Sequence, residues 1–251
     1  MDNQAWAAAL RDSAAMGAAN SWLLNPADLS VLWPPYQFAT VPDPFIYTNV
    51  IRHRYPLPSD PTHVFSDVRM RLGASFEQFV RALHLPEVRV VVNAWDLTKP
   101  EDPRGRVRVL GVRAHGHSYV VRQLPGNTPA HTGYFVMTEH SDLALAKAVV
   151  KTLPSVPAGS IGRTVLTSGA QATRILTSPK HRVGTIEIYV GNGPSQCGTI
   201  VSWCDVVDDG RYLLASGDTP QGYGIDPELM IRMLHALFGY AIRSRMARQE
   251  R

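Results

Sequence analysis

The clearest structural signal in this chain lies in residues 87–123, EVRVVVNAWDLTKPEDPRGRVRVLGVRAHGHSYVVRQ. Residues 87–95 and 106–114 alternate in polarity and are rich in β-branched side chains, which is typical of half-buried strands. The tripeptide His115–Gly116–His117 then turns the chain into a third strand at 118–123. This stretch therefore predicts an antiparallel unit of three strands.

The same order of elements recurs further along the chain. Strands are predicted at 184–190 (GTIEIYV), 199–206 (TIVSWCDV) and 211–216 (RYLLAS), after an earlier fourth strand at 133–138. Both tight turns precede an aromatic residue, in GHSYVV and GRYLLA. Since one helix on a three-stranded sheet buries its apolar face poorly, two copies packed together would complete a core. The pattern favours an α+β fold built from two similar halves.

Helical spacing of apolar residues predicts the remaining elements. Helices are expected at 22–32, 75–83, 141–153 and 171–176, and in a last segment opened by Pro227. Their expected N-caps are Asn25, Ser75, Ser141 and Asp226. Leu143 and Tyr240 are assigned to apolar helix faces. The proline-rich segment 34–62 is expected to be an extended connector with an edge strand near 45–52, and 65–72 is compatible with helix or strand.

Composition excludes several classes of protein. The 251 residues are 45% hydrophobic and 18% charged, with a formal net charge of +4, which is ordinary for a globular domain. Arginines are scattered singly apart from the C-terminal residues, so no basic stripe for nucleic acid is expected. No run approaches the roughly 20 apolar residues of a membrane span. With two cysteines and no signal-peptide pattern, we expect a cytoplasmic protein without membrane insertion.

Few residues suggest catalysis or a cofactor. The loop GNGPSQCG at 191–198 precedes a strand, whereas a phosphate-binding glycine loop requires a helix there. His115, His117, Cys197 and Cys204 lack the local spacing of zinc ligands, so no metal is expected. No Gly-x-Ser-x-Gly elbow is present. The interpretation is a protein with no catalytic residues, no metal and no cofactor.

Four segments together resemble the EspG family, the cytosolic chaperones of type VII (ESX) secretion. They are WLLNPADLSVLWPPYQFATVPDPF at 22–45, GVRAHGHSYVVRQLPG at 111–126, VKTLPSVPAGSIGRTV at 150–165, and GTIEIYVG with GTIVSWCDVVDDGRYLLAS at 184–216. In the last segment Asp205, Gly210, Arg211 and Tyr212 match a recurring family pattern. Residues 191–198 depart from it, because an arginine-rich loop would be expected there.

The resemblance implies both an architecture and a function. It implies a central antiparallel β-sheet flanked by helical bundles, in a single EspG-like domain over residues 1–251. The two pseudo-symmetric halves would cover about 20–155 and about 156–251. The implied partner is a PE–PPE heterodimer, bound through the apolar tip of its PPE subunit for export. A weak homodimer is left open, and no nucleic acid is implied.

Strand alternation suggests where the partner would bind. Ile186 and Ile188 alternate with Glu187 and Tyr189, so one face of this strand is polar and aromatic, and that face could continue onto Ser202 and Ser216. We therefore expect partner binding at these four residues, namely Glu187, Tyr189, Ser202 and Ser216. The alternatives are ordinary solvated strand residues here and, for the whole chain, an enzyme on a duplicated α+β scaffold or a nucleic-acid-binding regulator.

Overall fold

A ten-stranded antiparallel sheet organises the molecule. The structure, a computed structural model, describes residues 18–32, 44–46, 59–191 and 197–249. Within these ranges the strand order is β1-β5-β4-β3-β2-β7-β8-β9-β10-β6, so that β2 and β7 lie at the centre. Six α-helices accompany the sheet in the described part of the chain. The fold is therefore α+β, as the sequence predicted.

The strands from the first part of the chain form one side of the sheet. They are β2 (Val88–Asp96), β3 (Arg106–Ala114), β4 (His117–Pro125) and β5 (Thr132–Ser141), with β1 (Asn20–Leu24) as the edge strand paired to β5. The predicted turn between β3 and β4 is a two-residue hairpin, since His115 and Gly116 both have positive φ values. Such a turn matches the twist of the strands it joins.

The strands from the second part continue the same sheet. They are β7 (Lys180–Val190), β8 (Cys197–Val206), β9 (Gly210–Ala215) and β10 (Gln221–Gly224), with the two-residue β6 (Thr164–Val165) at the other edge. The two sets join where β2 pairs with β7 over its whole length, from Val88 opposite Val190 to Asp96 opposite Arg182. One continuous sheet therefore contains strands from both ends of the sequence.

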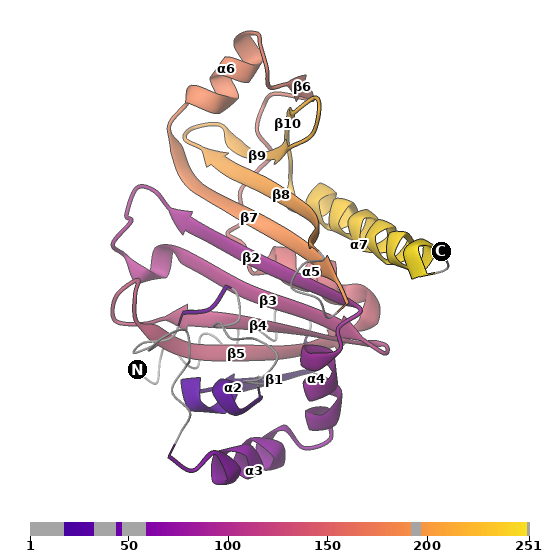
Figure 1. The fold of residues 1–251 in the computed structure, drawn as a ribbon. Coiled ribbons are helices and arrows are strands. Elements are labelled where there is room, and N and C mark those ends of the chain that lie inside the picture. Colours follow the sequence, from indigo (N-terminus) through magenta and orange to yellow (C-terminus); the bar gives the residue numbers. More distant parts are fainter. Residues whose placement is uncertain (1–17, 33–43, 47–58, 192–196, 250–251) are drawn as a thin grey trace.

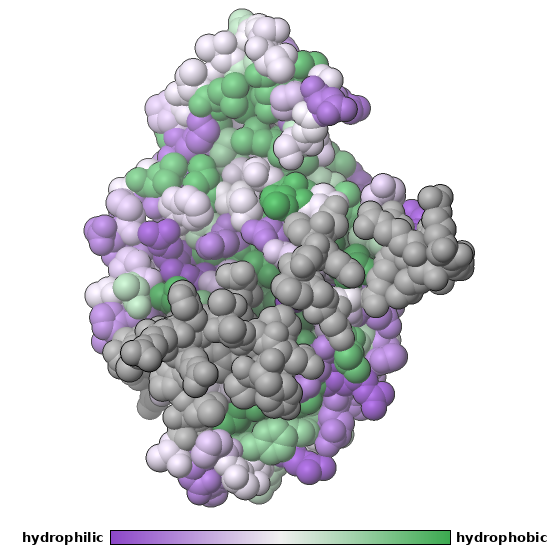
Figure 2. All heavy atoms as spheres, viewed as in Figure 1, coloured by the Kyte–Doolittle hydropathy of each residue, from purple (hydrophilic) through white to green (hydrophobic). Residues whose placement is uncertain are grey.

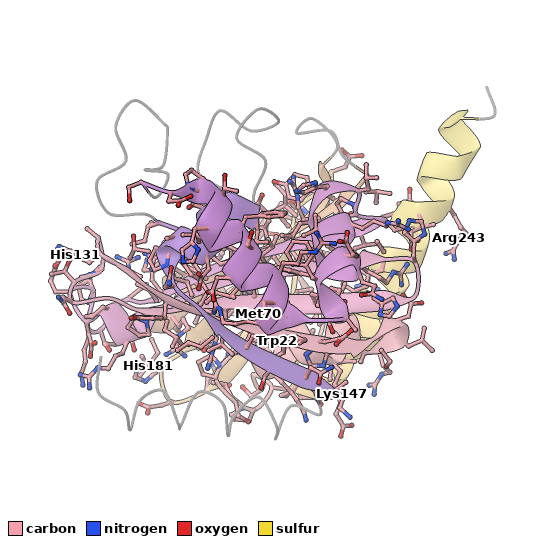
Figure 3. All side chains as sticks on the ribbon, turned by 90° about the horizontal axis from the view of Figure 1, so that it is seen from below. Trp22, Met70, His131, Lys147, His181 and Arg243 are labelled. Atoms are coloured by element: carbon pink, nitrogen blue, oxygen red, sulfur yellow. The ribbon has the colours of Figure 1, made fainter. Side chains whose placement is uncertain are left out.

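Helices cover both faces of this sheet. Figure 1 shows α2 (Pro26–Leu32), α3 (Pro61–Leu72) and α4 (Ser75–His84) together near β1, β5 and β4, and α6 (Ala170–Thr177) at the opposite end near β6 and β10. The helices α5 (Leu145–Lys151) and α7 (Pro227–Gln249) pack against each other and on the other face. Seen from below, Trp22 of β1 and Met70 of α3 lie far from Arg243, which lies on the projecting part of α7 (Figure 3).

Two main apolar clusters fill the space between helices and sheet. One lies under α5 and α7 and contains Val90, Ile186, Trp203 and Met230 among its buried members. The other lies under α2, α3 and α4 and includes Phe79 and Tyr119. Because side chains alternate along a strand, β2 contributes Val90 to the first cluster and Val91 to the second. Strand β2, at the centre of the sheet, is therefore covered by apolar packing on both faces.

Several local predictions are confirmed. The amide of Asp28 donates to Oδ1 of Asn25 at 2.9 Å, and the amide of Asn25 donates to Oδ2 of Asp28 at 2.7 Å, so Asn25 caps α2 reciprocally. Oδ1 of Asp226 accepts from the amide of Leu229 at 2.7 Å at the start of α7. The strand predicted at 106–114 coincides with β3.

Other local predictions are wrong for identifiable reasons. Trp22 belongs to strand β1 because it pairs with Met137 of β5, so helix α2 begins only at Pro26. Ser75 lies inside α4, and its Oγ donates to Glu139 of β5 at 2.9 Å instead of capping the helix. Ser141 is the N-cap residue of a short 3₁₀ turn (Asp142–Ala144) that precedes α5, but its side chain forms no capping hydrogen bond.

Apolar faces and the connector also differ in part from the predictions. Leu143 lies on the 3₁₀ turn and is 75% exposed, so it is not part of a buried face. Tyr240 is exposed, and the most buried side chains of α7 are those of Met230, Leu234, Phe238 and Ala241. Residues 65–72 are helical within α3. Most of the expected edge strand at 45–52 lies outside the described residues.

Arg211 and Tyr212 hold the segment between the two sets of strands against β9. The amide of Arg211 donates to the carbonyl of Pro157, and the amide of Gly159 donates back to the carbonyl of Arg211. The hydroxyl of Tyr212 accepts from the amide of Ile161 at 3.0 Å and donates to Asp209 at 2.6 Å. The ring lies so close that a Cβ on Gly159 would be 2.2 Å from it. The GRY sequence is therefore a structural anchor for the connecting segment.

A candidate partner-binding face on the central strands

Three of the four expected partner-binding residues share one face of the sheet. Glu187 and Tyr189 project from β7 on the side opposite Ile186 and Ile188, which are buried under α5 and α7. Ser202 lies on β8 directly opposite Thr185 of β7. The pairing of β8 with β7, which the sequence did not specify, places Ser202 on the same face as Glu187 and Tyr189.

The fourth expected residue is less well placed. Ser216 follows the last residue of β9, which ends at Ala215, and is exposed. Its neighbour two residues earlier, Leu214, pairs with Ser202 and is half-buried. Ser216 therefore lies at the margin of this face, beyond the end of the paired strand.

A larger surface surrounds these residues, and we call it the central face. It consists of seven side chains on β2, β7 and β8, which are half-buried except for Ile200, exposed to 51%: Arg89, Asn93, Thr185, Glu187, Tyr189, Ile200 and Ser202. Within the described ranges, α4 covers the neighbouring part of the sheet on one side. Ile175 of α6 covers Cys204 and Tyr212 on the other. Figure 2 shows hydrophilic residues gathered across the middle of the molecule in this view.

Polar interactions organise the central face. The hydroxyl of Tyr189 donates to Oε2 of Glu187 at 2.5 Å. The guanidinium of Arg89 lies 4.4 Å from the centroid of the Tyr189 ring, which is a favourable cation–π distance. Ile200 lies opposite Glu187 in the register of β7 and β8. An exposed aliphatic side chain among oriented polar groups suits contact with another protein more than chemistry on a substrate.

Sequence reasoning missed two arginines beside this face. Arg106 and Arg108 of β3 alternate with residues of the other face, and they lie opposite Trp95 and Asn93 of β2. The guanidinium of Arg106 lies 5.7 Å from the Trp95 ring centroid. Burial, reinforced by the charge of Arg106, lowers the pKa of Arg108. Only the register of β3 against β2 could have revealed their location.

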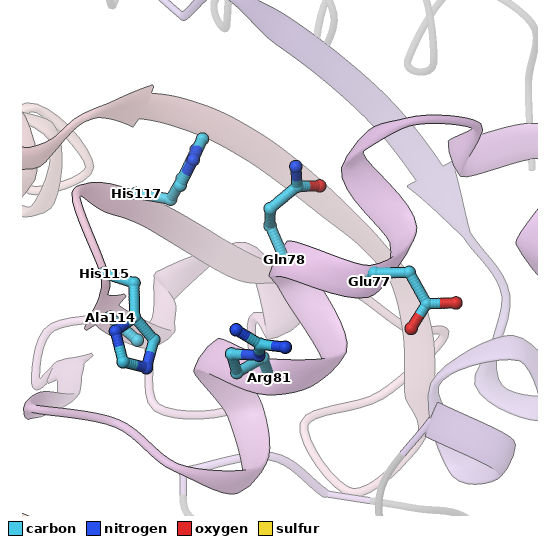
Figure 4. A pocket seen from close by; sticks show the side chains of 6 residues that line it. All are labelled: Glu77, Gln78, Arg81, Ala114, His115 and His117. Atoms are coloured by element: carbon cyan, nitrogen blue, oxygen red, sulfur yellow. The ribbon is translucent and has the colours of Figure 1, made fainter.

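A polar pocket lies between α4 and the β3–β4 turn, outside the central face. Its volume is about 290 Å³, and it is lined by Glu77, Gln78, Arg81, Ala114, His115 and His117. Figure 4 shows Gln78 and Arg81 of α4 on the side of His115 and His117, whereas the side chain of Glu77 points away from the two histidines. Nδ1 of His117 lies 3.6 Å from Oε1 of Glu139, and the amide of His115 donates to Oε1 of Glu87 at 3.0 Å.

Glu139 itself is the centre of a hydrogen-bonded cluster. It accepts from Asn20 at 2.8 Å, from Ser75 at 2.9 Å and from the hydroxyl of Tyr119 at 3.1 Å. Burial alone would raise the pKa of Glu139, but these hydrogen bonds hold it below its usual range. The cluster ties β1, α4 and β4 to β5, and its role is structural.

The candidate zinc ligands from the sequence do not form one site. His115 and His117 lie at the β3–β4 turn, whereas Cys204 lies in β8 in the apolar cluster beneath α6. Burial raises the pKa of the Cys204 thiol, which disfavours the nucleophilic thiolate. The side chain of Cys197 lies outside the described part. In the residues that the structure describes, no three His, Cys, Asp or Glu side chains cluster as metal ligands.

Asp208 and Asp209 belong to the β8–β9 turn. Asp208 has a positive φ of 57°, and Asp209 accepts from the amide of Ser160 at 2.7 Å. These carboxylates therefore shape a turn and fasten the connecting segment.

No helix of the described residues is long and apolar enough to cross a membrane.

Comparison with known proteins identifies the fold and the family. None of the curated proteins compared with this chain matches it. A chain of the solved structure of the Mycobacterium tuberculosis type VII secretion system chaperone EspG5 in complex with PE25-PPE41 dimer is similar, with a TM-score of 0.51. The identity is 11%, and the match covers 84% of this chain and 93% of that one, so the likeness concerns the fold. The model of the EspG family matches residues 26–225, most of the chain, and the protein therefore belongs to the EspG family.

Proposed function

We propose that this protein is a cytosolic chaperone that binds the PPE subunit of a PE–PPE heterodimer and delivers it for type VII secretion. The family match over residues 26–225 carries the proposal. A similar fold occurs in the EspG5 structure, whose description names a PE25-PPE41 dimer as the partner of that protein. A binding role also agrees with the central face, which offers a broad surface instead of a deep cleft.

The order of strands supports a single domain, residues 1–251, made of two pseudo-symmetric halves at about 20–155 and 156–251. Outward from the centre, one side reads β2, β3, β4, β5, β1 and the other reads β7, β8, β9, β10, β6. On each side four consecutive strands are followed by an edge strand that precedes them in sequence. A helix, α5 or α7, follows each set. Such a repeat doubles the width of sheet available to a partner.

The proposed contact surface is the central face with its margin at Ser216. Ile200 would supply apolar contact with the tip of the PPE subunit, and Glu187, Tyr189 and Ser202 would supply oriented polar contacts around it. A stable interface buries about 800 Å² on each partner, so neighbouring helices must contribute as well. We also propose that the free chain forms a weak homodimer.

The experiment is co-expression with PE–PPE pairs, followed by gel filtration and measurement of the dissociation constant. A ternary complex supports the proposal, and failure with every pair tested would refute it. The variants Ile200→Asp and Glu187→Lys test the location. Leu143→Asp is the matched control for Ile200→Asp, because Leu143 is also exposed but belongs to the short turn before α5.

We expect about tenfold or greater weakening for Ile200→Asp and Glu187→Lys, and no change for Leu143→Asp. If these two variants and substitutions at Tyr189, Ser202 and Ser216 all leave affinity unchanged, the binding surface lies elsewhere on the molecule. Gel filtration of the free chain over a concentration series tests the homodimer independently.

A further inference from the structure

Arg106 and Arg108 are the least compensated charges beside the central face. Their side chains lie on the same side of β3, two residues apart, and in the described part of the chain no carboxylate lies within 4.0 Å of either guanidinium. The Nε of Arg106 is buried without a hydrogen-bond partner. One terminal nitrogen of Arg108 donates to the carbonyl of Pro129 at 3.2 Å. This neutral acceptor satisfies one donor but does not neutralise the positive charge.

On the opposite face of the same sheet, the arginines that stabilise the fold are paired with aspartates. Arg211 donates twice to Asp205, at 2.7 and 3.0 Å, and Arg182 reaches both Asp205 and Asp96. A half-buried guanidinium without such an acid is unfavourable, and a second one beside it adds like-charge repulsion. Burial and the neighbouring Arg106 together lower the pKa of Arg108, in agreement with this cost.

Residues of the central face do not supply the missing charge. Glu187 is the acidic member of that face, and it accepts from Tyr189 on its own strand. Arg108 lies opposite Asn93 of β2, and Asn93 lies opposite Thr185 of β7, so Arg108 is two strands away from β7. At about 4.8 Å between strands the two backbones are on the order of 10 Å apart. Among the described residues, Glu187 forms no ion pair within 4.0 Å with Arg106 or Arg108. Two arginines therefore lie beside the β3 side of the central face, whereas its β7 side carries the carboxylate of Glu187 together with Arg89, whose guanidinium lies over the Tyr189 ring.

We propose that Arg106 and Arg108 receive a carboxylate of the chaperoned protein, so that the segment seated on the central face carries an acidic side chain at its β3 end. Trp95 packs beside Arg106 and would limit water at the contact. Each guanidinium presents a planar fork of N–H donors that binds a carboxylate in a defined geometry. The opposite charge of Glu187 would then fix the direction in which the segment lies. This inference rests on the proposed function, because it assigns a chemical feature to that partner.

The test uses the PE–PPE heterodimer retained in co-expression and compares Arg106→Gln and Arg106→Glu with the unchanged chain. We expect affinity to fall roughly ten- to a hundredfold, with a smaller dependence on salt concentration for Arg106→Gln. The matched control is Arg232→Glu, an equal charge reversal at an exposed position of α7. Thermal unfolding of each variant checks that the loss is not due to misfolding.

A charge exchange makes the test specific to the carboxylate. Reversing the acidic residues of the partner one at a time to lysine should restore binding to Arg106→Glu for one of them. If the unchanged chain binds the heterodimer and Arg106→Glu binds it as tightly as Arg232→Glu does, this inference is wrong while the proposed function stands. If the unchanged chain binds no heterodimer, both are overturned.

Discussion

Removal of the carboxylate of Asp205 should strongly destabilise the fold. Its two oxygens accept from Nε and Nη2 of Arg211 at 2.7 and 3.0 Å, and Nη1 of Arg182 lies 3.4 Å away. Arg211 is only 1% exposed, and its guanidinium lies 4.4 Å from the Trp203 ring centroid. In Asp205→Ala the arginine would keep its bond to the carbonyl of Pro154 but lose its counter-charge.

The size of the effect follows from the burial of this pair. Loss of one partner of a buried ion pair costs about 3–5 kcal/mol. For a chain of this length each kcal/mol lowers the melting temperature by about 2–4 °C, so Asp205→Ala should melt roughly 6–20 °C lower. Differential scanning calorimetry and urea unfolding at pH 7 measure the change. Asp205→Asn keeps a hydrogen-bond acceptor without the charge, so its melting temperature should lie between those of Asp205→Ala and the unchanged chain.

A control variant and a double variant complete the design. Asp102→Ala removes a pair with Arg104 at 2.8 Å in which the arginine is exposed, together with the cap that Asp102 provides to the amide of Arg104. Its melting temperature should therefore fall by only about 2–4 °C. Replacing both buried partners, in Asp205→Leu with Arg211→Met, should recover much of the loss because no charge is left buried. If Asp205→Ala melts within the scatter of Asp102→Ala, the pair does not stabilise the fold and the reasoning is refuted.

Three further predictions concern the anchor of the connecting segment, acid stability and a helix cap. Gly159→Ala should cost about 1–3 kcal/mol or more because its Cβ would meet the ring of Tyr212, whereas Gly162→Ala, with open space around it, should be neutral; equal unfolding midpoints would contradict this. The pKa of Glu139 is held below its usual value by hydrogen bonds that outweigh burial, so this group stabilises the fold above about pH 4.3, and the contribution is lost as pH falls through the lower folded pKa. Between about pH 5 and about pH 3, the free energy of unfolding of Glu139→Gln should therefore depend less on pH than that of the unchanged chain. Parallel pH profiles for the two proteins would argue against this role of Glu139. Asn25→Ala removes the cap of α2 and should cost about 1 kcal/mol in chemical unfolding, with no loss expected if the cap is dispensable.

The sequence was sufficient to predict strand β3, the turn that follows it and the cap of helix α2. The β-branched alternation at 106–114 corresponds to β3, and the His–Gly turn that follows adopts positive φ values as two-residue hairpins require. Asn25 before Pro26 caps a helix because both residues act within one turn of chain. These features depend on neighbours in sequence, so the sequence is sufficient to predict them.

Short elements at the edges of the sheet were not predictable in the same way. Trp22–Leu24 forms a strand because β5, more than a hundred residues later, offers a pairing edge. Strand β6 has two residues, and β10 has the sequence QGYG with two glycines, so neither carries a strand signal of its own. Ser75 bonds to a distant glutamate for the same reason: its partner is chosen by packing.

One part of the candidate site was predictable from the sequence, and the other part depended on the tertiary structure. Alternation along 184–190 was enough to place Glu187 and Tyr189 on one face and the isoleucines on the other, because side chains of a strand point to opposite sides in turn. The tertiary structure decided that β7 pairs with β2, that helices bury the isoleucine face, and that Arg106 and Arg108 lie beside the other one. Pairing between strands about ninety residues apart depends on the packing of the whole chain, which no local pattern encodes.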